Sequence, residues 1–298
     1  MSVRFGYVAM LVAMGLGWGS TQPLGKIAVS TGHKQFGLIF WQMVVGIVLL
    51  GAILIVQRRR IPITRQTLGF AVLISLIGTI IPNSTFYYSV AHLPSGIMSI
   101  LISTVPLMAF PVALMLGMDR FSAGRLAGLL CGLIGVALIA LPSASLPDAG
   151  MAAYLPIAMI GPLFYAFEGN YVARFGTAGM DAVQAMCLAS VLGAVIMLPV
   201  AVGSGQWIDL TQPWGKPEVA LLVGSVVHNL CYCAYVWLAA RAGAVFAAQT
   251  SYIVTGTGVI WAMLLLGERF SGWIWAALAV MLLGLFLVQP REALPKAA

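Results

Sequence analysis

The acidic side chain that lies deepest inside a long apolar segment of this sequence is Glu168. It stands in the segment 151–173, whose other residues are mostly apolar. A charge at the centre of a lipid bilayer costs about 2.5–3.5 kcal/mol on insertion scales, so such a residue usually has a function. We expect Glu168 to face a cavity and to bind the amino group of a ligand or to take up a proton. The alternative is an ion pair with Arg174, near the end of the same segment.

Other polar side chains recur on single helical faces inside apolar segments. Trp18, Gln22 and Lys26 follow each other every four residues, which places them on one face of a helix. Polar groups in hydrocarbon need partners or water, so such stripes indicate a cavity or a helix contact. Besides Glu168, the residues predicted to line a cavity that binds a small molecule are Trp18, Gln22, Gln42, Thr79, Asn83, Tyr87, Ser99, Ser103, Tyr165, His228, Asn229, Tyr232, Gln249, Tyr252 and Trp261.

Plainer roles remain open for many of these side chains. A Ser or Thr hydroxyl in a helix often bonds to a carbonyl of its own helix. Lys26 could bind a carboxylate, but we favour the alternative that its long stem reaches toward the outer surface. Prolines within the apolar segments, such as Pro82 and Pro162, each remove a backbone hydrogen bond. Such breaks are tolerated where protein or a water-filled cavity covers the freed groups.

The composition indicates which elements must hold these side chains. Hydrophobic residues make up 61% of the 298 residues and charged residues only 8%, against roughly a quarter charged in soluble domains. A membrane-spanning helix needs about 20 apolar residues, twice the length of a barrel strand. The sequence therefore predicts an all-α integral membrane protein with ten transmembrane helices. The predicted spans are 5–29, 36–56, 67–90, 95–117, 122–141, 151–173, 182–203, 217–239, 244–266 and 272–289.

The basic residues predict an orientation. With ten spans the two termini share a side, and eleven Lys and Arg residues fall on that side against four on the other. Because basic residues favour the cytoplasmic side, we expect both termini in the cytoplasm of a bacterial inner membrane. The net charge of +7 thus orients the chain, and no nucleic-acid partner is predicted. The four cysteines lack disulfide or metal spacing, and we expect neither a metal nor a cofactor.

Two halves of the chain resemble each other at a spacing of about 150 residues. The phrase "LGMDRFS" at 116–122 returns as "LGERFS" at 266–271. The same shift pairs Gly46 with Gly193, Gly78 with Gly224, Asn83 with Asn229 and Trp18 with Tyr165. The predicted repeats are 1–146 and 147–298, each with five spans. Because five is odd, the second repeat must be inverted relative to the first.

Inversion places the two acids of the repeated phrase at opposite membrane surfaces. We expect Asp119 at the cytoplasmic rim and Glu268 at the outer rim, each in the first turn of the next helix along the chain. Asn83 and Asn229 are equivalent, and both cavity lining and bonding between repeats remain open for them. Inverted repeats are typical of alternating-access secondary transporters, whose substrate site lies where the repeats meet.

The paired turns, the ten spans, the five-plus-five duplication and the "GWGST" at 17–21 resemble the drug/metabolite transporter superfamily, specifically the EamA-type exporters. The similarity covers essentially the whole chain, although Met118 adds a residue to the first turn. It implies a central cavity lined by spans one to four and six to nine, with spans five and ten at the periphery. Within the superfamily the chain resembles bacterial exporters of amino acids and metabolites, including the aromatic amino-acid branch.

These observations predict a secondary transporter that exports small amphipathic metabolites, most of all amino acids, through a lipid bilayer. The alternative within the superfamily is a multidrug or nucleobase-type exporter; a passive channel is a further one. A membrane-embedded enzyme is disfavoured because the three histidines are predicted at different depths. Gly124, Gly128 and Gly132 form a small-residue ladder, either an internal contact or a dimer seam, so the expected state is a monomer or a homodimer.

Overall fold

The computed structural model describes residues 3–142, 144–242 and 249–288, and the regular elements in these ranges are helices. In chain order they are α1 (Val3–Ala28), α2 (Gln35–Val56), α3 (Arg65–Ile74), the π-helix η1 (Ser75–Ile80), α4 (Ile81–His92), α5 (Ser95–Ile102), α6 (Thr104–Met115), α7 (Ala123–Ala140), the 3-10 helix η2 (Ala149–Tyr154), α8 (Leu155–Phe175), α9 (Ala182–Gly203), α10 (Lys216–Ala242), α12 (Thr250–Leu266) and α13 (Gly272–Leu287).

Among the described residues, seven helical segments are long and apolar enough to cross a membrane. They are Gln35–Val56, Arg65–His92, Ser95–Met115, Ala123–Ala140, Ala149–Phe175, Ala182–Gly203 and Lys216–Tyr235. The helices α12 and α13 are shorter apolar helices. The first residues of the predicted span 244–266 and the last of 272–289 lie outside the described ranges. An all-α, multi-pass membrane protein is confirmed.

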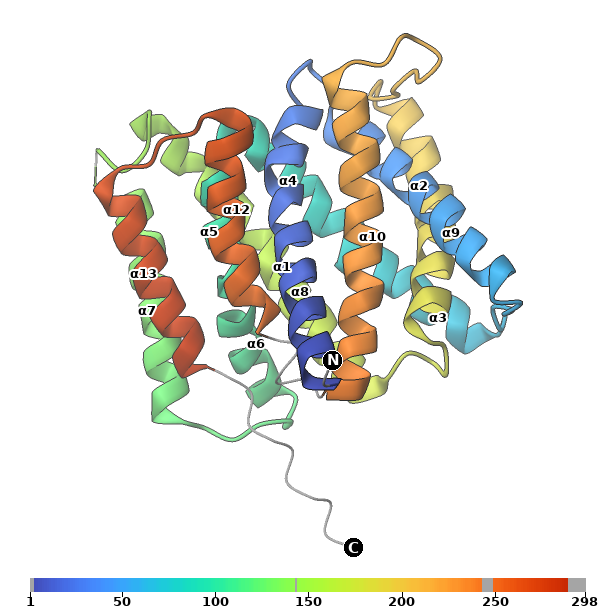
Figure 1. Cartoon of the computed structure of the whole chain (residues 1–298), viewed down its shortest axis with the longest axis horizontal. Helices are drawn as coiled ribbons and strands as arrows, with labels where there is room; N and C mark the ends of the chain where they lie inside the picture. Colours follow the sequence, from blue (N-terminus) through green and yellow to red (C-terminus); the bar gives the residue numbers. More distant parts are fainter. Residues whose placement is uncertain (1–2, 143, 243–248, 289–298) are drawn as a thin grey trace, which may run out of the picture.

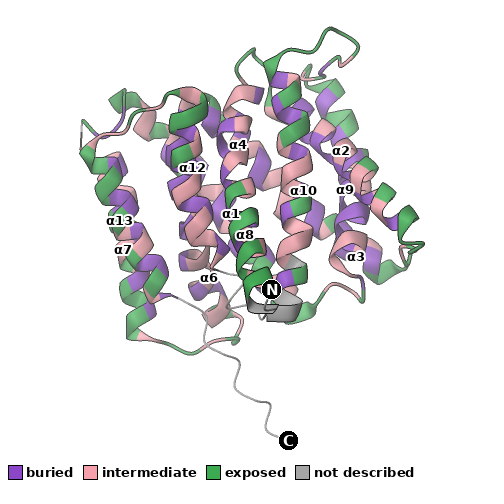
Figure 2. Cartoon of the chain, viewed as in Figure 1, coloured by how far each residue is buried: buried purple, intermediate pink, exposed green. Residues whose placement is uncertain are grey.

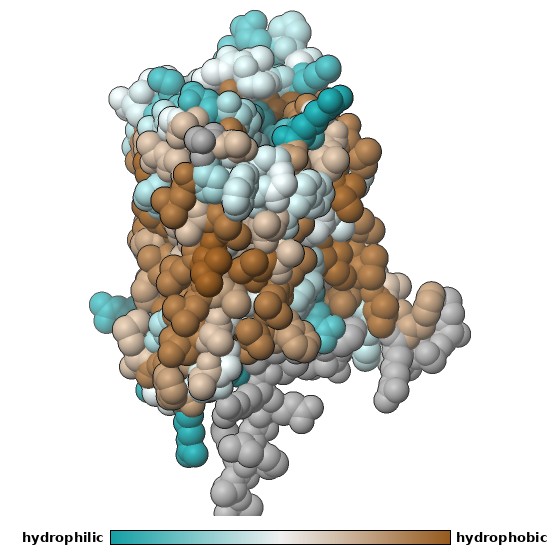
Figure 3. All heavy atoms as spheres, turned by 90° about the vertical axis from the view of Figure 1, so that its left-hand side faces the viewer, coloured by the Kyte–Doolittle hydropathy of each residue, from teal (hydrophilic) through white to brown (hydrophobic). Residues whose placement is uncertain are grey.

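The outer surface of the helices is apolar over a broad band. Figure 3 shows this band on the side formed by α7 and α13, with hydrophilic residues gathered toward the upper end. Large apolar side chains such as Ile55 (78% exposed) and Phe286 (65% exposed) point outward, and Figure 2 shows many exposed positions along the outer helices. A soluble monomer rarely exposes apolar patches beyond a few hundred Å². Lipid is the solvent that suits this surface.

Helices from the two halves of the chain alternate in space. In Figure 1, α1 runs through the middle of the molecule between α12 and α10, and α2 packs against α9. The helices α7 and α13 form a pair at the left edge. Gly128 and Gly132 are the residues that let this region pack closely: a Cβ on Gly128 would lie 2.7 Å from the Gly284 carbonyl oxygen, and one on Gly132 would collide with Leu107. These two positions of the small-residue ladder are an internal contact.

The two similar turns lie at opposite ends of the molecule: the α6–α7 turn is at the bottom of Figure 1 and the α12–α13 turn at the top. Gly117 and Gly267 both take the left-handed conformation, with φ of 65°, which glycine adopts without steric cost.

The predicted role of the acids in these turns is wrong, because neither Asp119 nor Glu268 lies in the first turn of the next helix along the chain. Glu268 does not cap α13, the next helix along the chain; its carboxylate accepts hydrogen bonds from Ser95 and Gly96 at the start of α5. The first N–H groups of a helix have no partner within that helix, and those of α5 are within reach of Glu268. Asp119 accepts from the Arg120 backbone N–H and forms an ion pair with Arg125.

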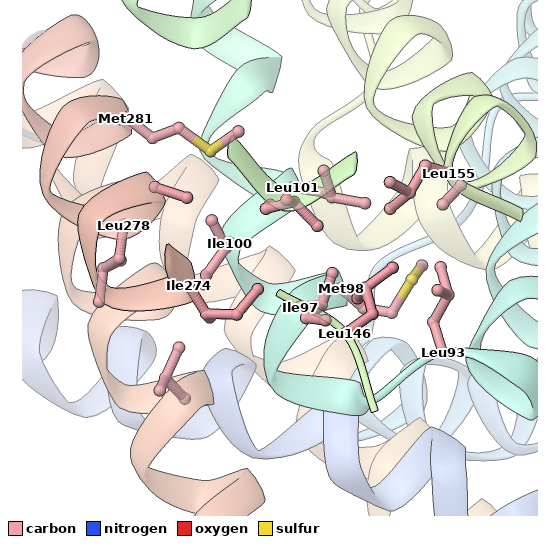
Figure 4. Close-up of a cluster of buried hydrophobic side chains, with 14 of the residues drawn as sticks. Leu93, Ile97, Met98, Ile100, Leu101, Leu146, Leu155, Ile274, Leu278 and Met281 are labelled. Carbon is pink, nitrogen blue, oxygen red and sulfur yellow. The ribbon is translucent and has the colours of Figure 1, made fainter. Parts of the chain in front are cut away.

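A buried apolar cluster holds α5 in place. Figure 4 shows Ile97, Ile100 and Leu101 of α5 facing residues of α13 and of the segment that joins the two halves. Ile274 and Met281 of α13 are part of this cluster and are almost fully buried. In a bilayer such a cluster stabilises the fold through van der Waals packing, because lipid tails are as apolar as these side chains. The cluster therefore fixes the position of α5, and two of its members, Met98 and Leu101, also line the cavity described below.

Candidate functional site

A cavity of about 70 Å³ lies among α1, α2, α4, α5, α8 and α10, and so receives side chains from both halves of the chain. Its polar lining residues are Thr21, Gln22, Gln42, Asn83, Tyr87, Tyr165 and His228. The rest of the wall is apolar and includes Phe86, Met98, Leu101 and Pro162. Pockets that hold a drug-sized ligand usually measure about 300–1,000 Å³. The cavity is thus contracted, and helices must separate before a ligand of that size can occupy it.

A chain of side-chain hydrogen bonds crosses one wall of the cavity and joins the two halves. Gln42 Oε1 accepts from Asn83 Nδ2 and from the Tyr87 hydroxyl, both at 3.1 Å. The Tyr165 hydroxyl donates to Asn83 Oδ1 at 3.2 Å. Tyr165 lies on α8, whereas Gln42 and Asn83 lie on α2 and α4.

Gln22 presents an unsatisfied oxygen at the cavity. The side chain is 9% exposed, and its Oε1 has no hydrogen-bond partner among the described residues. Leaving a buried acceptor unpaired costs about 1–3 kcal/mol. A hydrogen-bond donor on a bound molecule would remove that cost, so Gln22 is suited to recognise an N–H or O–H group.

Glu168 occupies a different place from the predicted one. It lies about one helical turn beyond Tyr165 on α8, is 9% exposed, and is absent from the cavity wall. Its carboxyl packs against Gly78 of the π-helix η1, where an added Cβ would collide with Oε1. Tyr165 and Tyr232 lie within electrostatic reach of it. π-Helical turns within α-helices are frequent at functional sites.

The alternative of an ion pair between Glu168 and Arg174 is not found. The ion pairs of the described residues join His33 to Glu218, Arg59 to Asp181 and Arg125 to Asp119. The Arg174 guanidinium instead lies over the Phe175 ring, 5.7 Å from its centroid. Glu168 therefore sits buried without a described cation, the setting in which a mobile proton or a ligand amine can bind.

Six predicted residues are brought together in the cavity wall: Gln22, Gln42, Asn83, Tyr87, Tyr165 and His228. Trp18 lies beside His228, with ring centroids 6.3 Å apart, and beside Tyr235, with ring centroids 5.8 Å apart. Tyr232 packs beside the apolar cluster of α2 and α9. Thr79 is half-buried within η1.

The remaining predicted residues are not gathered at this cavity. The Ser99 and Ser103 hydroxyls donate to the carbonyls of Ser95 and Ile100 on their own helix, which is the plainer role expected for Ser in a helix. Asn229 donates from Nδ2 to the Ser225 carbonyl of its own helix at 2.8 Å, in contrast to its equivalent Asn83.

Trp261 donates from its indole N–H to the Leu16 carbonyl at 3.0 Å and thereby joins α12 to α1. Gln249 and Tyr252 line a separate, open hollow with Leu11 and Ile253. Neither Gln249 nor Tyr252 lines the cavity. The sequence pattern thus assigned to one site residues that lie in two different places in the fold.

Lys26 is bonded to backbone carbonyls of the first half. Its Nζ donates to the carbonyls of Leu93 at 2.9 Å and Ala91 at 3.3 Å, at the end of α4. A cation suits the carbonyl end of a helix. This contact directs the ammonium group of Lys26 to the α4–α5 connection.

Several lining residues were not predicted. Phe86 and Met98 are apolar and resemble any lipid-facing or core side chain, so the sequence held no signal for them. Pro82 and Pro162 did carry one, because a proline inside a span frees a carbonyl that a cavity can cover. Both prolines line the cavity.

Comparison with known proteins agrees with this architecture. One solved structure, described only as the crystal structure of a protein, is 14% identical, covers 95% of this chain and 96% of its own, and has a TM-score of 0.65. At that identity the likeness shows the fold alone. No match was found among curated proteins. Two segments, residues 4–141 and 153–289, match the EamA-like transporter family. With one match in each half, the chain belongs to the EamA-like transporter family.

Proposed function

We propose that this protein is a secondary transporter that exports small amphipathic metabolites, most of all amino acids including aromatic ones, by alternating access. Family membership indicates a small-molecule transporter in a lipid bilayer. The observation that carries the finer proposal is the cavity whose polar wall is built by both halves, joined by the bond from Tyr165 to Asn83. Substrate sites at the interface of two repeats are typical of alternating-access transporters.

The proposed topology is ten spans in two inverted five-helix repeats, 1–146 and 147–298, with both termini in the cytoplasm of a bacterial inner membrane. The opposite placement of the α6–α7 and α12–α13 turns supports inversion. The greater number of basic residues on the side of the termini supports the orientation. On this topology the cavity opens alternately to either end as the repeats rock against each other.

The chemistry of the wall supports a substrate without net charge. The described lining residues of the cavity include no Lys, Arg, Asp or Glu. Phe86, Tyr87 and Tyr165 offer aromatic faces, and Gln22 offers an unpaired carbonyl oxygen. An amphipathic zwitterion such as an aromatic amino acid fits this combination, because its side chain can contact the rings while its ammonium donates hydrogen bonds.

Glu168 is proposed to bind the substrate ammonium or a proton once the helices separate. Toward η1 its carboxyl meets Gly78, which has no side chain to hold it. An ionised carboxylate buried without a cation is costly, so binding either positive species there stabilises the conformation that admits it.

Reconstitution into liposomes tests the proposal. Purified protein should catalyse saturable counterflow of labelled aromatic amino acids, measured beside nucleosides and cationic drugs. Uptake of drugs or nucleosides alone would replace the amino-acid assignment by the alternative exporter type, and flux without counterflow would indicate a channel.

The Glu168→Gln variant separates the two roles of the carboxyl. If it binds the ammonium, the KM rises about tenfold or more, because losing one partner of a buried charge pair costs about 2–5 kcal/mol. If it carries a proton, the transport rate stops varying with pH. Glu168→Asp, which retains the carboxyl, is the control. Unchanged KM and unchanged pH dependence in Glu168→Gln would remove Glu168 from the mechanism.

A further inference from the structure

Glu268 makes a polar contact of three hydrogen bonds between the two halves, outside the cavity. Its Oε1 accepts from the Ser95 N–H at 2.7 Å and from the Ser95 hydroxyl at 2.9 Å, and its Oε2 accepts from the Gly96 N–H at 3.0 Å. The contact joins the α12–α13 turn of the second half to the first turn of α5 in the first half. Free N–H groups and the helix dipole make a helix start favourable for a carboxylate.

Two further side chains, Phe270 and Lys26, contact the first turn of α5 and the connection that precedes it. The Phe270 ring packs on Gly96 so closely that an added Cβ would collide with it. On the other side, Lys26 of α1 donates to the Leu93 carbonyl at 2.9 Å, and its charge attracts that of Glu268. The connection between α4 and α5 is therefore held by α1 and by the α12–α13 turn together.

The contacts that α12 itself makes with α5 and α1 are formed by small residues. Gly258 of α12 packs against Ser99 of α5 and the Gly19 carbonyl, and Gly15 of α1 packs against Ile253 of α12. Contacts through small residues allow close approach without fixing a direction. Charge-assisted hydrogen bonds are short and directional, so a movement of the helices that preserves the small-residue contacts would still break the bonds to Glu268.

The helix that Glu268 holds is also a wall of the cavity, through Met98, Leu101 and Ile102. We propose that Glu268 is a latch: it holds α5 against α12 in the structure and releases Ser95 and Gly96 when this end of the cavity opens. The latch rests on the proposed alternating access. Ser95 is 0% exposed, so its released N–H and hydroxyl need new partners, and water entering an opened end supplies them.

Cross-linking tests whether the contact must open. Cysteines placed at Ser95 and Glu268, with the four native cysteines replaced, are joined by a short bifunctional thiol reagent that can be reduced. We expect cross-linked protein to lose transport and reduced protein to regain it. Ser145 and Ser271 provide the matched pair: the Ser271 hydroxyl, on the same turn, donates to the Ser145 carbonyl at 3.0 Å. Because this contact does not involve α5, a cross-link there should leave transport intact. Normal transport by the 95–268 cross-linked protein would overturn the latch.

A second readout does not depend on transport of any chosen substrate. A cysteine at Thr21, in the cavity wall, reports access from this end by its reaction with a membrane-impermeant thiol reagent. Glu268→Gln retains one acceptor but loses the charge. Because charge-assisted hydrogen bonds are about twice as strong as neutral ones, the contact with α5 should weaken. The cysteine at Thr21 should then be labelled faster, on the order of tenfold. Ser271→Ala should leave the labelling rate unchanged, and Glu268→Asp should lie between the two. Labelling that does not change in Glu268→Gln contradicts the latch, whereas failure of every substrate in liposomes contradicts only the proposed function.

Discussion

Asn83 and Asn229 occupy equivalent positions in the two halves and behave differently. Asn83 lines the cavity and bonds to Gln42 and Tyr165, so it links three helices. Asn229 bonds to Ser225 on its own helix and lies beside Gly46. A duplicated sequence therefore produces one asparagine that belongs to the cavity and one that belongs to a helix contact.

The backbones that carry these residues differ in the same way. Asn83 comes after the π-helix η1, Ser75–Ile80, whereas the equivalent stretch before Asn229 lies within the continuous α-helix α10. A π-helical turn inserts an extra residue into the helix and rotates the next residues about the helix axis. This rotation is consistent with Asn83 facing the cavity. The two halves therefore differ in backbone conformation as well as in side-chain contacts.

The largest expected contrast is between substitutions of the two asparagines. Asn83→Leu removes the donor to Gln42 and the acceptor for Tyr165, and unpaired buried groups cost about 1–3 kcal/mol each. The KM for transport should rise about tenfold or more. Asn229→Leu should change it by less than about threefold, because the amide of Asn229 bonds to a carbonyl of its own helix and its loss leaves a smaller defect. Initial-rate transport in liposomes measures both. Equal losses would mean that the two residues exchange roles during the cycle.

The next contrast concerns the two equivalent glycines. A Cβ on Gly78 would collide with the Glu168 carboxyl, whereas one on Gly224 would meet only Leu24, at 3.6 Å. Gly78→Ala should destabilise the protein by about 1–3 kcal/mol, the usual cost of overpacking. Gly224→Ala should be neutral or stabilising by up to about 1 kcal/mol, since alanine favours helix. Thermal unfolding in detergent measures both, and a stable Gly78→Ala would show that Glu168 is free to move away.

The smallest contrast is expected where the halves are alike. Gly46 faces Ser190 and Asn229, and Gly193 faces Met43 and Ser75. The side chain of Met43 is flexible and can repack, and Ser190 is small. We expect Gly46→Ala and Gly193→Ala to lower the unfolding temperature alike, with free energies within about 1 kcal/mol of each other. A large difference between them would extend the asymmetry from the cavity to the α2–α9 contact.

Composition and repetition predicted the fold better than the site. Apolar runs of membrane length set the helices, because hydrocarbon forces the backbone to bond within each segment. The repeated turn phrase located Gly117 and Gly267 correctly at helix ends, since a left-handed residue there is a local requirement. The partner of Glu268 was not predictable, because Ser95 lies 173 residues away and its proximity depends on packing.

The predicted residues that line the cavity include those whose side chains could not satisfy their hydrogen bonds on one helix. Gln22, Gln42 and Asn83 have amides that seldom find all their partners on one helix, and all three reached the cavity. Ser99 and Ser103 could bond to their own helix and did so. Glu168 was identified as unusual, but its position against Gly78 depends on the π-helix, for which the sequence carries no recognised signal.

The lack of charged residues in the described wall of the cavity has an electrical consequence. A zwitterion that crosses in such a cavity moves no net charge, so membrane voltage should have little effect on its flux. One elementary charge moved through 100 mV corresponds to about 2.3 kcal/mol, so a single proton carried on Glu168 would make the flux clearly voltage-dependent. Current recorded from the reconstituted protein would thus show whether the carboxyl of Glu168, beside Gly78, carries a proton during the transport cycle.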